Sequence, residues 1–365
     1  MITVAHMDEQ NGFRGGEQQA SWLVRGLAEQ GVANILVGRP SQPFLSMHSQ
    51  LKNVRRMALP LRGEFDLYSA YRLARMTIAE KVDIVHAHTS HAHGIAVLAR
   101  LLGAPSRLVV SRRVNFMPRG DFLNRWKYNR ADRILCVSGA VQETLGRFGL
   151  DAPRLKTVHS AVDLERALMT PVSRASLGVP DEVPFLFSAG SLVDHKDHDN
   201  LLRAFALVRK SFPEARLCIA GDGPLLQTLR DRCASLDIAA SVSFPGYRKD
   251  APGICRNADV YISSSWSEGL GTSILEALAS GTPVVATEAG GAREMVIPGV
   301  TGMLVPARTP QALADAVLFT LGHRNEALQM AERGKAHILE HFSVERMVAA
   351  TLETYLELAF PKPPE

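Results

Sequence analysis

The stretch Glu268-Gly-Leu-Gly-Thr-Ser-Ile-Leu-Glu276 joins a glycine loop to the start of a helix. The spacing of apolar residues predicts a helix over residues 273–280, which Gly281 and Pro283 then stop. Glycines let backbone N–H groups come close to a ligand, and a helix N-terminus carries about half a positive charge. Together, the loop and the helix predict a binding site for a diphosphate.

The two glutamates of this stretch favour a sugar nucleotide over a bare phosphate. Glu276 would repel a phosphate, but its carboxylate can accept hydrogen bonds from vicinal hydroxyls such as those of a ribose. Bonds to a charged group contribute about 1.5–3 kcal/mol each. Glu268 could do the same for a sugar. The alternative is structural, because Ser273 and Glu276 have the spacing of a capping box, in which Glu276 would only satisfy an N–H group at the helix end.

Length and composition indicate a globular protein of two domains. Single cores rarely grow beyond about 250–300 residues, and this chain has 365, of which 46% are hydrophobic and 21% charged. No run of about 18 apolar residues occurs, and the first residues read as a strand followed by acidic side chains. We therefore expect neither a membrane-spanning helix nor a signal peptide. The four cysteines stand singly, which favours buried thiols in a reducing cytoplasm.

Charge is divided unevenly along the chain. Residues 1–165 contain 22 Lys and Arg against 14 Asp and Glu, a net charge of +8, whereas the remainder carries −4. In residues 112–130, arginines and a lysine alternate with Phe, Trp and Tyr, a pattern that suits an anionic membrane surface or an acceptor carrying phosphate. The alternative is a solvated helix with its aromatic side chains packed inward. The mild overall charge and the lack of a recognition motif argue against nucleic acid.

Strands and helices alternate along the whole chain. This rhythm is interrupted by a looser, proline-containing stretch at residues 163–184. Alternation of this kind predicts parallel sheets covered on both faces, so we expect an α/β protein with two doubly wound, Rossmann-like domains facing a cleft. The glycine turns that follow strands would line that cleft, because ligands bind beyond the carboxyl ends of such strands.

Several motifs resemble those of GT-B-fold glycosyltransferases, in particular family 4, and the resemblance covers nearly the whole chain. They are Gly15-Gly16-Glu17, Asp83-Ile-Val-His86-Ala-His88, Ser138, Ala220-Gly221-Asp222-Gly223-Pro224, Ser265-Trp-Ser-Glu268-Gly269, Glu276-Ala-Leu-Ala-Ser-Gly281-Thr-Pro283, Gly290-Gly291-Ala-Arg-Glu294 and Gly302-Met-Leu-Val-Pro306.

The resemblance implies an acceptor-binding N-terminal domain, 1–165, and a donor-binding C-terminal domain, 166–342, with a last helix at 343–360 crossing back to the first. It also implies transfer from a nucleotide sugar with retained anomeric configuration, without a metal or any other cofactor.

The same resemblance assigns roles to individual residues. Glu276 would bind the ribose of the donor, Glu268 would contact the transferred sugar or steady the loop beneath it, and Lys196 would neutralise the departing diphosphate. The residues nearest to the chemistry would be Lys196, Glu268, His88 and Arg113. Those that would surround the donor are Gly15, Gly16, Gly190, Gly221, Gly223, Arg248, Gly269, Leu270, Gly271, Thr272 and Glu276.

The sequence departs from the family pattern at two places. Ser191 stands where an arginine commonly precedes the lysine by five residues, and Arg112-Arg113 stands where many members have a histidine. Arginine cannot act as a base near neutral pH, but Arg113 could bind an acceptor phosphate through two hydrogen bonds or stabilise the diphosphate.

Four histidines, His86, His88, His91 and His93, lie close together in the sequence. Spacings of two and five residues can ligate zinc, but no carboxylate or cysteine accompanies them, so we expect no metal site here. His86 and His88 would share one face of a strand. The open alternatives are that His88 orients a sugar or that the histidines pack at a domain seam.

These observations favour a cytoplasmic glycosyltransferase that adds a sugar to an envelope glycan, such as lipopolysaccharide, or to a lipid-linked acceptor at the inner face of the membrane. The alternatives are a nucleotide-sugar epimerase or phosphorylase on the same fold and a non-catalytic binder of sugar nucleotides. A dinucleotide enzyme would need a Gly-x-Gly-x-x-Gly turn after its first strand, which the sequence lacks.

Overall fold

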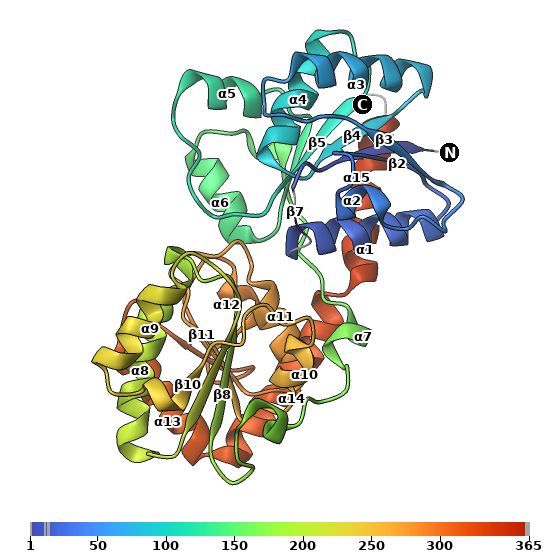
Figure 1. Cartoon of the computed structure of the whole chain (residues 1–365). Coiled ribbons are helices and arrows are strands. Elements are labelled where there is room, and N and C mark those ends of the chain that lie inside the picture. Colours follow the sequence, from blue (N-terminus) through green and yellow to red (C-terminus); the bar gives the residue numbers. More distant parts are fainter. Residues whose placement is uncertain (1, 11, 13–14, 362–365) are drawn as a thin grey trace. The chain divides into compact units, whose positions relative to one another are not determined.

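The computed structural model describes residues 2–10, 12 and 15–361, and its chain divides into two compact α/β units. The first unit runs to Ser160 and includes the C-terminal segment from Val344, and the second is Ala161–Ser343. Figure 1 shows the elements of both units. The predicted doubly wound fold is confirmed, as is the membership of the last helix in the first unit.

The first unit is built on a parallel seven-stranded sheet with the order β3-β2-β1-β4-β5-β6-β7. Its strands are β1 (Thr3–Met7), β2 (Ala33–Gly38), β3 (Val54–Ala58), β4 (Ile84–Ala87), β5 (Arg107–Arg112), β6 (Arg133–Cys136) and β7 (Leu155–Thr157). Its helices are α1 (Gly15–Glu29), α2 (Pro43–Ser46), α3 (Leu67–Ala79), α4 (Ser90–Leu101), α5 (Phe122–Tyr128), α6 (Gly139–Arg147) and α15 (Val344–Ala359), with a 3-10 turn at Ala152–Arg154.

Helix α15 is packed against the first helix of the chain. A Cβ added to Gly26 on α1 would lie 2.5 Å from Cγ2 of Val348 on α15, so the missing side chain is what lets the two helices approach. The hydroxyl of Tyr355, which is fully buried, hydrogen-bonds the ring of His86 on β4. These contacts join the end of the chain to the core of the N-terminal sheet.

The second unit has a parallel six-stranded sheet with the order β10-β9-β8-β11-β12-β13. Its strands are β8 (Phe185–Ala189), β9 (Arg216–Ala220), β10 (Val242–Ser243), β11 (Val260–Ser263), β12 (Val284–Thr287) and β13 (Met303–Val305). Its helices are α7 (Leu164–Ala167), α8 (His198–Ser211), α9 (Leu226–Ser235), α10 (Ala251–Cys255), α11 (Thr272–Ala279), α12 (Ala292–Met295), α13 (Pro310–Gly322) and α14 (Arg324–His341), with 3-10 turns at Arg174–Leu177, Asp194–Lys196 and Ala239–Ser241.

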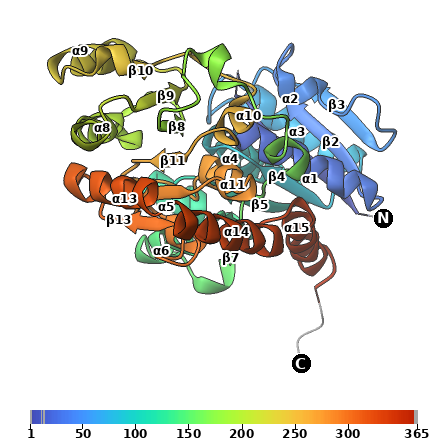
Figure 2. The same ribbon diagram turned by 90° about the horizontal axis from the view of Figure 1, so that it is seen from below.

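Helices cover both faces of the second sheet. Apolar side chains of α8, α9 and α13 pack with one face of the strands in a single buried cluster, while α11 contacts α14 on the other face. The view from below separates α8 and α9 from α11 and α14 (Figure 2). The sheets therefore have the burial on both faces that strand–helix alternation predicts. All four cysteines are free and buried, in agreement with the sequence.

Each sheet has one point where the strand order reverses. In the first unit it lies between β1 and β4, and in the second between β8 and β11. Loops that leave two neighbouring strands in opposite directions open a crevice at such a point, and ligands bind there in doubly wound folds. We therefore expect ligand-binding residues in the loops that follow β1, β4, β8 and β11.

Candidate active site

At the reversal point of the second unit, Lys196 and Glu268 form an ion pair. Lys196 ends the 3-10 turn after β8, and Glu268 lies in the loop after β11. The ammonium group donates to Oε1 of Glu268, which also accepts a hydrogen bond of 2.7 Å from the hydroxyl of Ser265. The two side chains are 19% and 11% exposed, so their charges are mostly removed from water. Two residues predicted to lie near the chemistry are thus brought together.

The loop after β11 is fixed to the turn that carries Lys196. The backbone N–H of Trp266 donates to the carbonyl of His195, and its indole Nε1 donates to the carbonyl of Asp194, at 3.0 and 3.1 Å. The hydroxyl of Ser264 donates to the carbonyl of Lys196 at 2.9 Å. The guanidinium of Arg308 lies 4.6 Å from the centre of the Trp266 ring. These contacts hold the backbone on both sides of the Lys196–Glu268 ion pair in place.

Helix α11 begins with a glycine in place of a side-chain cap. Gly271 is the N-cap residue, has φ +102°, and provides no side-chain hydrogen bond to the helix end. The first helical residue is Thr272, so Ser273 is the second and cannot be an N-cap. The capping-box interpretation of Ser273 and Glu276 is therefore wrong. A glycine at this position leaves the N-terminal amides open to an anion, while the preceding Leu270 is buried.

Glu276 is held by an arginine that the sequence did not reveal. Nε of Arg166, on α7, donates to Oε1 of Glu276 at 2.8 Å. Burial raises the pKa of Glu276, and the charge of Arg166 acts against that rise. Oε2 of Glu276 has no hydrogen-bond partner within the described part of the chain, and it remains able to accept bonds from a hydroxyl pair.

Two of the predicted donor glycines, Gly221 and Gly223, allow the close approach of loops. Gly221 has φ +153°, and a Cβ there would lie 1.9 Å from the carbonyl oxygen of Gly190. A Cβ on Gly223 would lie 2.4 Å from the carbonyl oxygen of Leu192. A Cβ on Gly190 itself would make only ordinary contacts of 3.6 Å with Cδ and Cε of Lys196, so Gly190 lies beside the lysine without requiring a glycine there. Gly221 and Gly223 therefore let the loop after β9 pack directly on the segment that leads to Lys196.

Arg248 is already paired in the structure. Its Nε and one terminal nitrogen donate to the two carboxylate oxygens of Asp250 at 2.7 and 2.6 Å. The neighbouring Tyr247 is 58% exposed, and its backbone N–H donates to Asp222 in the loop after β9. Arg248 is predicted to contact the nucleotide sugar, but two of its guanidinium nitrogens already donate to Asp250.

The first unit has a pocket of about 270 Å³ at its own reversal point. It opens beside the ends of β1, β4 and β5 and beside the start of α1. Its lining residues are Asp8, Gln10, Gly16, Glu17, His88, Thr89, Ser90, His93, Val110, Ser111, Arg112, Arg113, Val114 and Tyr128. The pocket therefore combines hydroxyls, carboxylates, two histidines and two arginines, a set suited to a polyhydroxylated or charged ligand.

The pocket has a perturbed carboxyl group that sequence reasoning missed. Asp8 follows β1 and is buried, and its Oδ1 accepts a hydrogen bond of 2.9 Å from the N–H of Gln10. Burial, aided by the charges of Glu17 and Glu9, raises the pKa of Asp8 to about 7. The side chain of Asp8 therefore changes charge near neutral pH. Its signal in the sequence was only the acidic residue that follows the first strand.

Two residues predicted to be catalytic, His88 and Arg113, lie together in this pocket. A terminal nitrogen of Arg113 is 3.3 Å from Nδ1 of His88. Gly16, one of the predicted donor residues, faces the same arginine, since a Cβ on it would lie 3.6 Å from Cδ of Arg113. Gly15 is the first residue of α1. The adjacent Arg112 instead donates to Tyr128 at 2.9 Å and to the carbonyl of Phe116, so it fixes the local fold.

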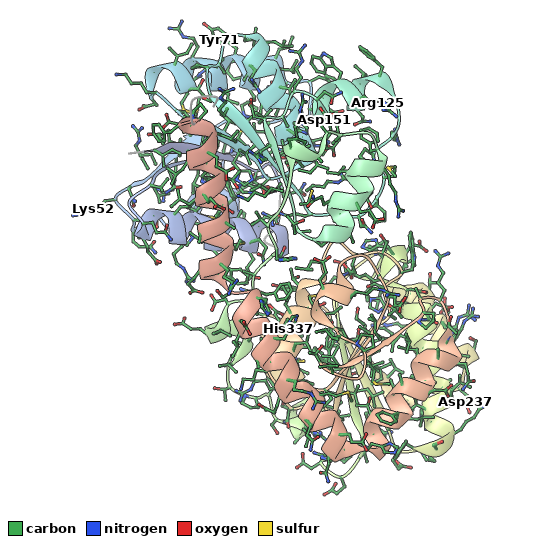
Figure 3. All side chains as sticks on the ribbon, turned by 180° about the vertical axis from the view of Figure 1, so that it is seen from behind. Lys52, Tyr71, Arg125, Asp151, Asp237 and His337 are labelled. Carbon is green, nitrogen blue, oxygen red and sulfur yellow. The ribbon has the colours of Figure 1, made fainter. Side chains whose placement is uncertain are left out.

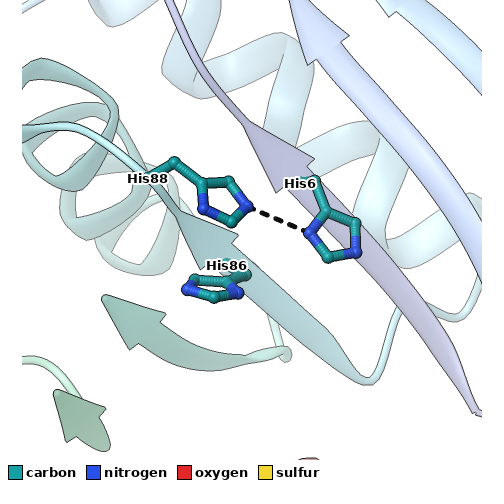
Figure 4. Close-up of side chains that lie close together, drawn as sticks. All are labelled: His6, His86 and His88. Carbon is teal, nitrogen blue, oxygen red and sulfur yellow. Dashed lines mark hydrogen bonds between the residues drawn. The ribbon is translucent and has the colours of Figure 1, made fainter. Parts of the chain in front are cut away.

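The four sequence histidines separate into two pairs. His86 and His88 are buried at the end of the sheet beside His6 of β1, as the close-up shows (Figure 4). His91 and His93 lie on α4, which begins at Ser90. His93 is buried against the carbonyl of Lys127, and His91 is exposed near Glu9. His6, His86 and His88 form the one cluster with metal-ligand geometry among the residues that the structure describes.

Two family models match the chain, one on each unit. The model described as Glycosyltransferase Family 4 matches residues 13–166, and that of Glycosyl transferases group 1 matches residues 169–337. The fold and the two matches define the chain as a glycosyltransferase.

Individual relatives lead to the same family. The lipopolysaccharide core biosynthesis glycosyltransferase LpsE of Rhizobium meliloti is 27% identical over 360 residues, 96% of each chain. A GDP-mannose-dependent phosphatidylinositol monomannoside mannosyltransferase of Mycobacterium tuberculosis is 30% identical over 272 residues, 70% of each chain. The present chain belongs to the family 4 glycosyltransferases of the GT-B fold.

Solved structures share the fold across the whole chain. HepE of Anabaena, in complex with UDP-glucose, superposes with a TM-score of 0.83 at 21% identity, covering 97% of this chain and all of that one. The lipopolysaccharide outer core galactosyltransferase WaaB superposes with a TM-score of 0.74 at 18% identity, covering both chains fully.

Proposed function

We propose that this glycosyltransferase takes its sugar from a nucleoside diphosphate donor bound by the second unit. The observation that carries the proposal is the Lys196–Glu268 pair beside the uncapped N-terminus of α11, with Glu276 on the same helix. The diphosphate would lie against the amides of Gly269–Thr272 and the ammonium of Lys196. The ribose would hydrogen-bond Glu276, and the sugar would meet Glu268. HepE, whose structure contains UDP-glucose, supports this class of donor.

The departing diphosphate gains negative charge as the glycosidic bond breaks. In our proposal, Lys196 and the amides of α11 stabilise that charge, so the reaction needs no metal ion. Glu268 holds the ammonium group in place and removes the cost of a lone buried cation. Transfer with retained configuration is part of the proposal and rests on the family to which the chain belongs.

The acceptor would bind to the first unit, in the pocket that contains Asp8 and Arg113. Its carboxylates suit sugar hydroxyls, and Arg113 suits a phosphate on the glycan or lipid. The relative LpsE acts in lipopolysaccharide core biosynthesis, which supports an envelope glycan as the acceptor. A step in the assembly of a lipopolysaccharide or lipid-linked glycan is therefore the activity that we propose.

A panel of nucleotide sugars tests the donor assignment. We expect one nucleoside diphosphate sugar to raise the melting temperature, and its nucleoside diphosphate to be released only when an acceptor extract is added. Thermal unfolding and a coupled nucleotide assay measure the two effects. Release or conversion of the donor without an acceptor would favour epimerisation, and stabilisation without turnover would favour a non-catalytic binder. Failure of every donor to stabilise the protein would contradict the proposal.

Peripheral contact with an anionic membrane is also part of the proposal, through a surface around α5. Arginines line a hollow of about 850 Å³ there, together with Phe122 and Trp126. Phe122 is 77% exposed and Leu123 57% exposed, whereas Tyr128 is buried, so the aromatic residues of this segment point both outward and inward. Arg125 lies at the outer surface of the unit (Figure 3). Within the described residues, no helix combines the length and the apolar character needed to cross a bilayer.

We expect the protein to bind vesicles that contain phosphatidylglycerol through the surface around α5, and we expect salt to weaken this binding because it screens the arginines. Replacing Phe122 and Leu123 together by serine should weaken binding at least about tenfold, because burying one large apolar side chain contributes about 1.5–3 kcal/mol. Co-sedimentation at two salt concentrations measures the effect. The matched control replaces Leu328 and Leu339, which are exposed on α14, by serine. Equal binding to neutral vesicles, or equal losses in both double variants, would contradict membrane contact through α5.

A further inference from the structure

Four buried or half-buried side chains of the first unit form a continuous hydrogen-bonded chain. Asn34 Oδ1 lies 3.1 Å from Nε2 of His6, and Nδ1 of His6 lies 3.1 Å from Nε2 of His88. Nδ1 of His88 is 3.3 Å from a terminal nitrogen of Arg113. Figure 4 shows the central bond, between His6 and His88. The chain runs from the interior of β2 to the pocket.

Asn34, at the interior end of the hydrogen-bonded chain, determines which ring nitrogen of His6 has the proton. Nδ2 of Asn34 donates to the carbonyl of Val32 at 2.9 Å, and a carbonyl can only accept, so the amide orientation is set. The Oδ1 of Asn34 therefore accepts from His6, which must have its proton on Nε2. The lone pair of His6 is then on Nδ1, and it must accept from Nε2–H of His88.

Arg113, at the pocket end of the hydrogen-bonded chain, independently requires the same tautomer of His88. A guanidinium can only donate, so Nδ1 of His88 must have its lone pair toward Arg113. His88 then has its proton on Nε2, as the interior end also requires. An added proton on either ring would face another N–H group, and burial opposes the charge as well. Burial lowers the pKa of His6 to about 4, and burial, aided by the neighbouring histidines and Arg113, holds the pKa of His88 well below its ordinary value.

The third ring of the cluster has its own partners. Nε2 of His86 lies 2.8 Å from the hydroxyl of Ser111, and its Nδ1 meets the hydroxyl of Tyr355. The centres of the His86 and His88 rings are 4.1 Å apart. Bound zinc needs lone pairs that converge on one point, whereas here every ring nitrogen already has a hydrogen-bond partner. The geometry therefore favours a proton-ordered chain over a metal site.

The hydrogen-bonded side chains end at Arg113, so Arg113 is the residue whose position they control. Its guanidinium lines the pocket, and its Nε is buried without a hydrogen-bond partner in the described part of the chain. We infer that Asn34 and His6 are positioning residues, which lock His88 in one neutral tautomer so that its lone pair holds Arg113 toward the pocket ligand. The role of Arg113 toward a ligand rests on the proposed function, but the tautomers do not.

Long-range proton–nitrogen NMR of protein labelled with 15N-histidine tests the tautomers directly. We expect both rings to be neutral, with the proton on Nε2, from about pH 5.5 to 8, whereas an ordinary histidine titrates near pH 6.5. His6→Gln and His88→Gln assign the signals. A proton on Nδ1 of either ring, titration of either ring in this range, or stoichiometric zinc binding that shifts the ring signals would overturn the inference. None of these outcomes depends on transferase activity.

A double-mutant cycle tests the positioning role. Asn34→Leu removes the interior end of the hydrogen-bonded chain, three hydrogen bonds away from the arginine. It should lower kcat/KM about tenfold or more, because small misplacements of a binding group are costly. In an Arg113→Lys background, Asn34→Leu should have little further effect. Equal losses in both backgrounds would mean that Asn34 has only a structural role, and would overturn the positioning role. The control is His48→Gln, whose ring hydrogen-bonds Ser21 in the same unit without a link to Arg113.

Discussion

Replacing Glu276 by glutamine should reduce transfer roughly a hundredfold, because two charge-assisted hydrogen bonds to the ribose contribute about 1.5 kcal/mol or more each. Glutamine keeps the size of the side chain and one acceptor oxygen but removes the charge. The loss should appear both in kcat/KM for the donor and in the affinity for the free nucleoside diphosphate, measured by calorimetry. Circular dichroism should show that the fold is intact.

Two further variants separate ribose binding from local stability. Arg166→Met removes the partner of Glu276 and keeps the carboxylate, so it should lower the melting temperature but leave a larger share of donor affinity. Glu288→Gln changes a glutamate that forms a more exposed ion pair with Arg293, and it should leave both properties unchanged. An undiminished rate in Glu276→Gln would refute the assignment of this residue to the donor.

Replacing Lys196 by methionine should lower kcat by about 100- to 1000-fold. Removing one preorganised group that stabilises developing charge typically costs about 2.7–4 kcal/mol, and the charge on the diphosphate is largest in the transition state. The Michaelis constant for the donor should change less than kcat. Steady-state kinetics with a saturating acceptor measures both quantities.

The Lys196 variant also leaves the mostly buried carboxylate of Glu268 without its cation, so its melting temperature should fall. Adding Glu268→Gln to Lys196→Met should recover much of the stability, since no lone charge remains. If the double variant also recovered the rate, Lys196 would be part of the structure and not of the chemistry.

The sequence predicted the fold well because the signals that define it are local. Glycine turns follow apolar runs, and amphipathic helices separate them, so both doubly wound sheets could be predicted. Two strands gave no such signal. Strand β3 lies at the sheet edge, where only Val54 of its five residues is buried, and β13 has only three residues. A solvent-facing strand such as β3 lacks the continuous apolar pattern of a central strand, and the three apolar residues of β13 are too few to mark a strand.

The candidate site was only partly predictable, because its partners come from distant segments. Arg166 and Glu276 are 110 positions apart, and no motif marks the arginine. His6 meets His86 and His88 through the register of β1 with β4, which the sequence does not specify. The capping-box interpretation had the correct spacing but the wrong start, since Gly271 begins the helix in a left-handed conformation.

The contact between Gly26 and Val348 has a consequence for biosynthesis. The segment that completes the N-terminal core is translated only after the entire 161–343 region. Because domains tend to fold as they emerge from the ribosome, the apolar face of α1 is not yet covered by α15 while the second unit forms. The N-terminal unit can therefore be completed only after α15 has been synthesised, and a chain released before that point would leave this face of α1 open to solvent.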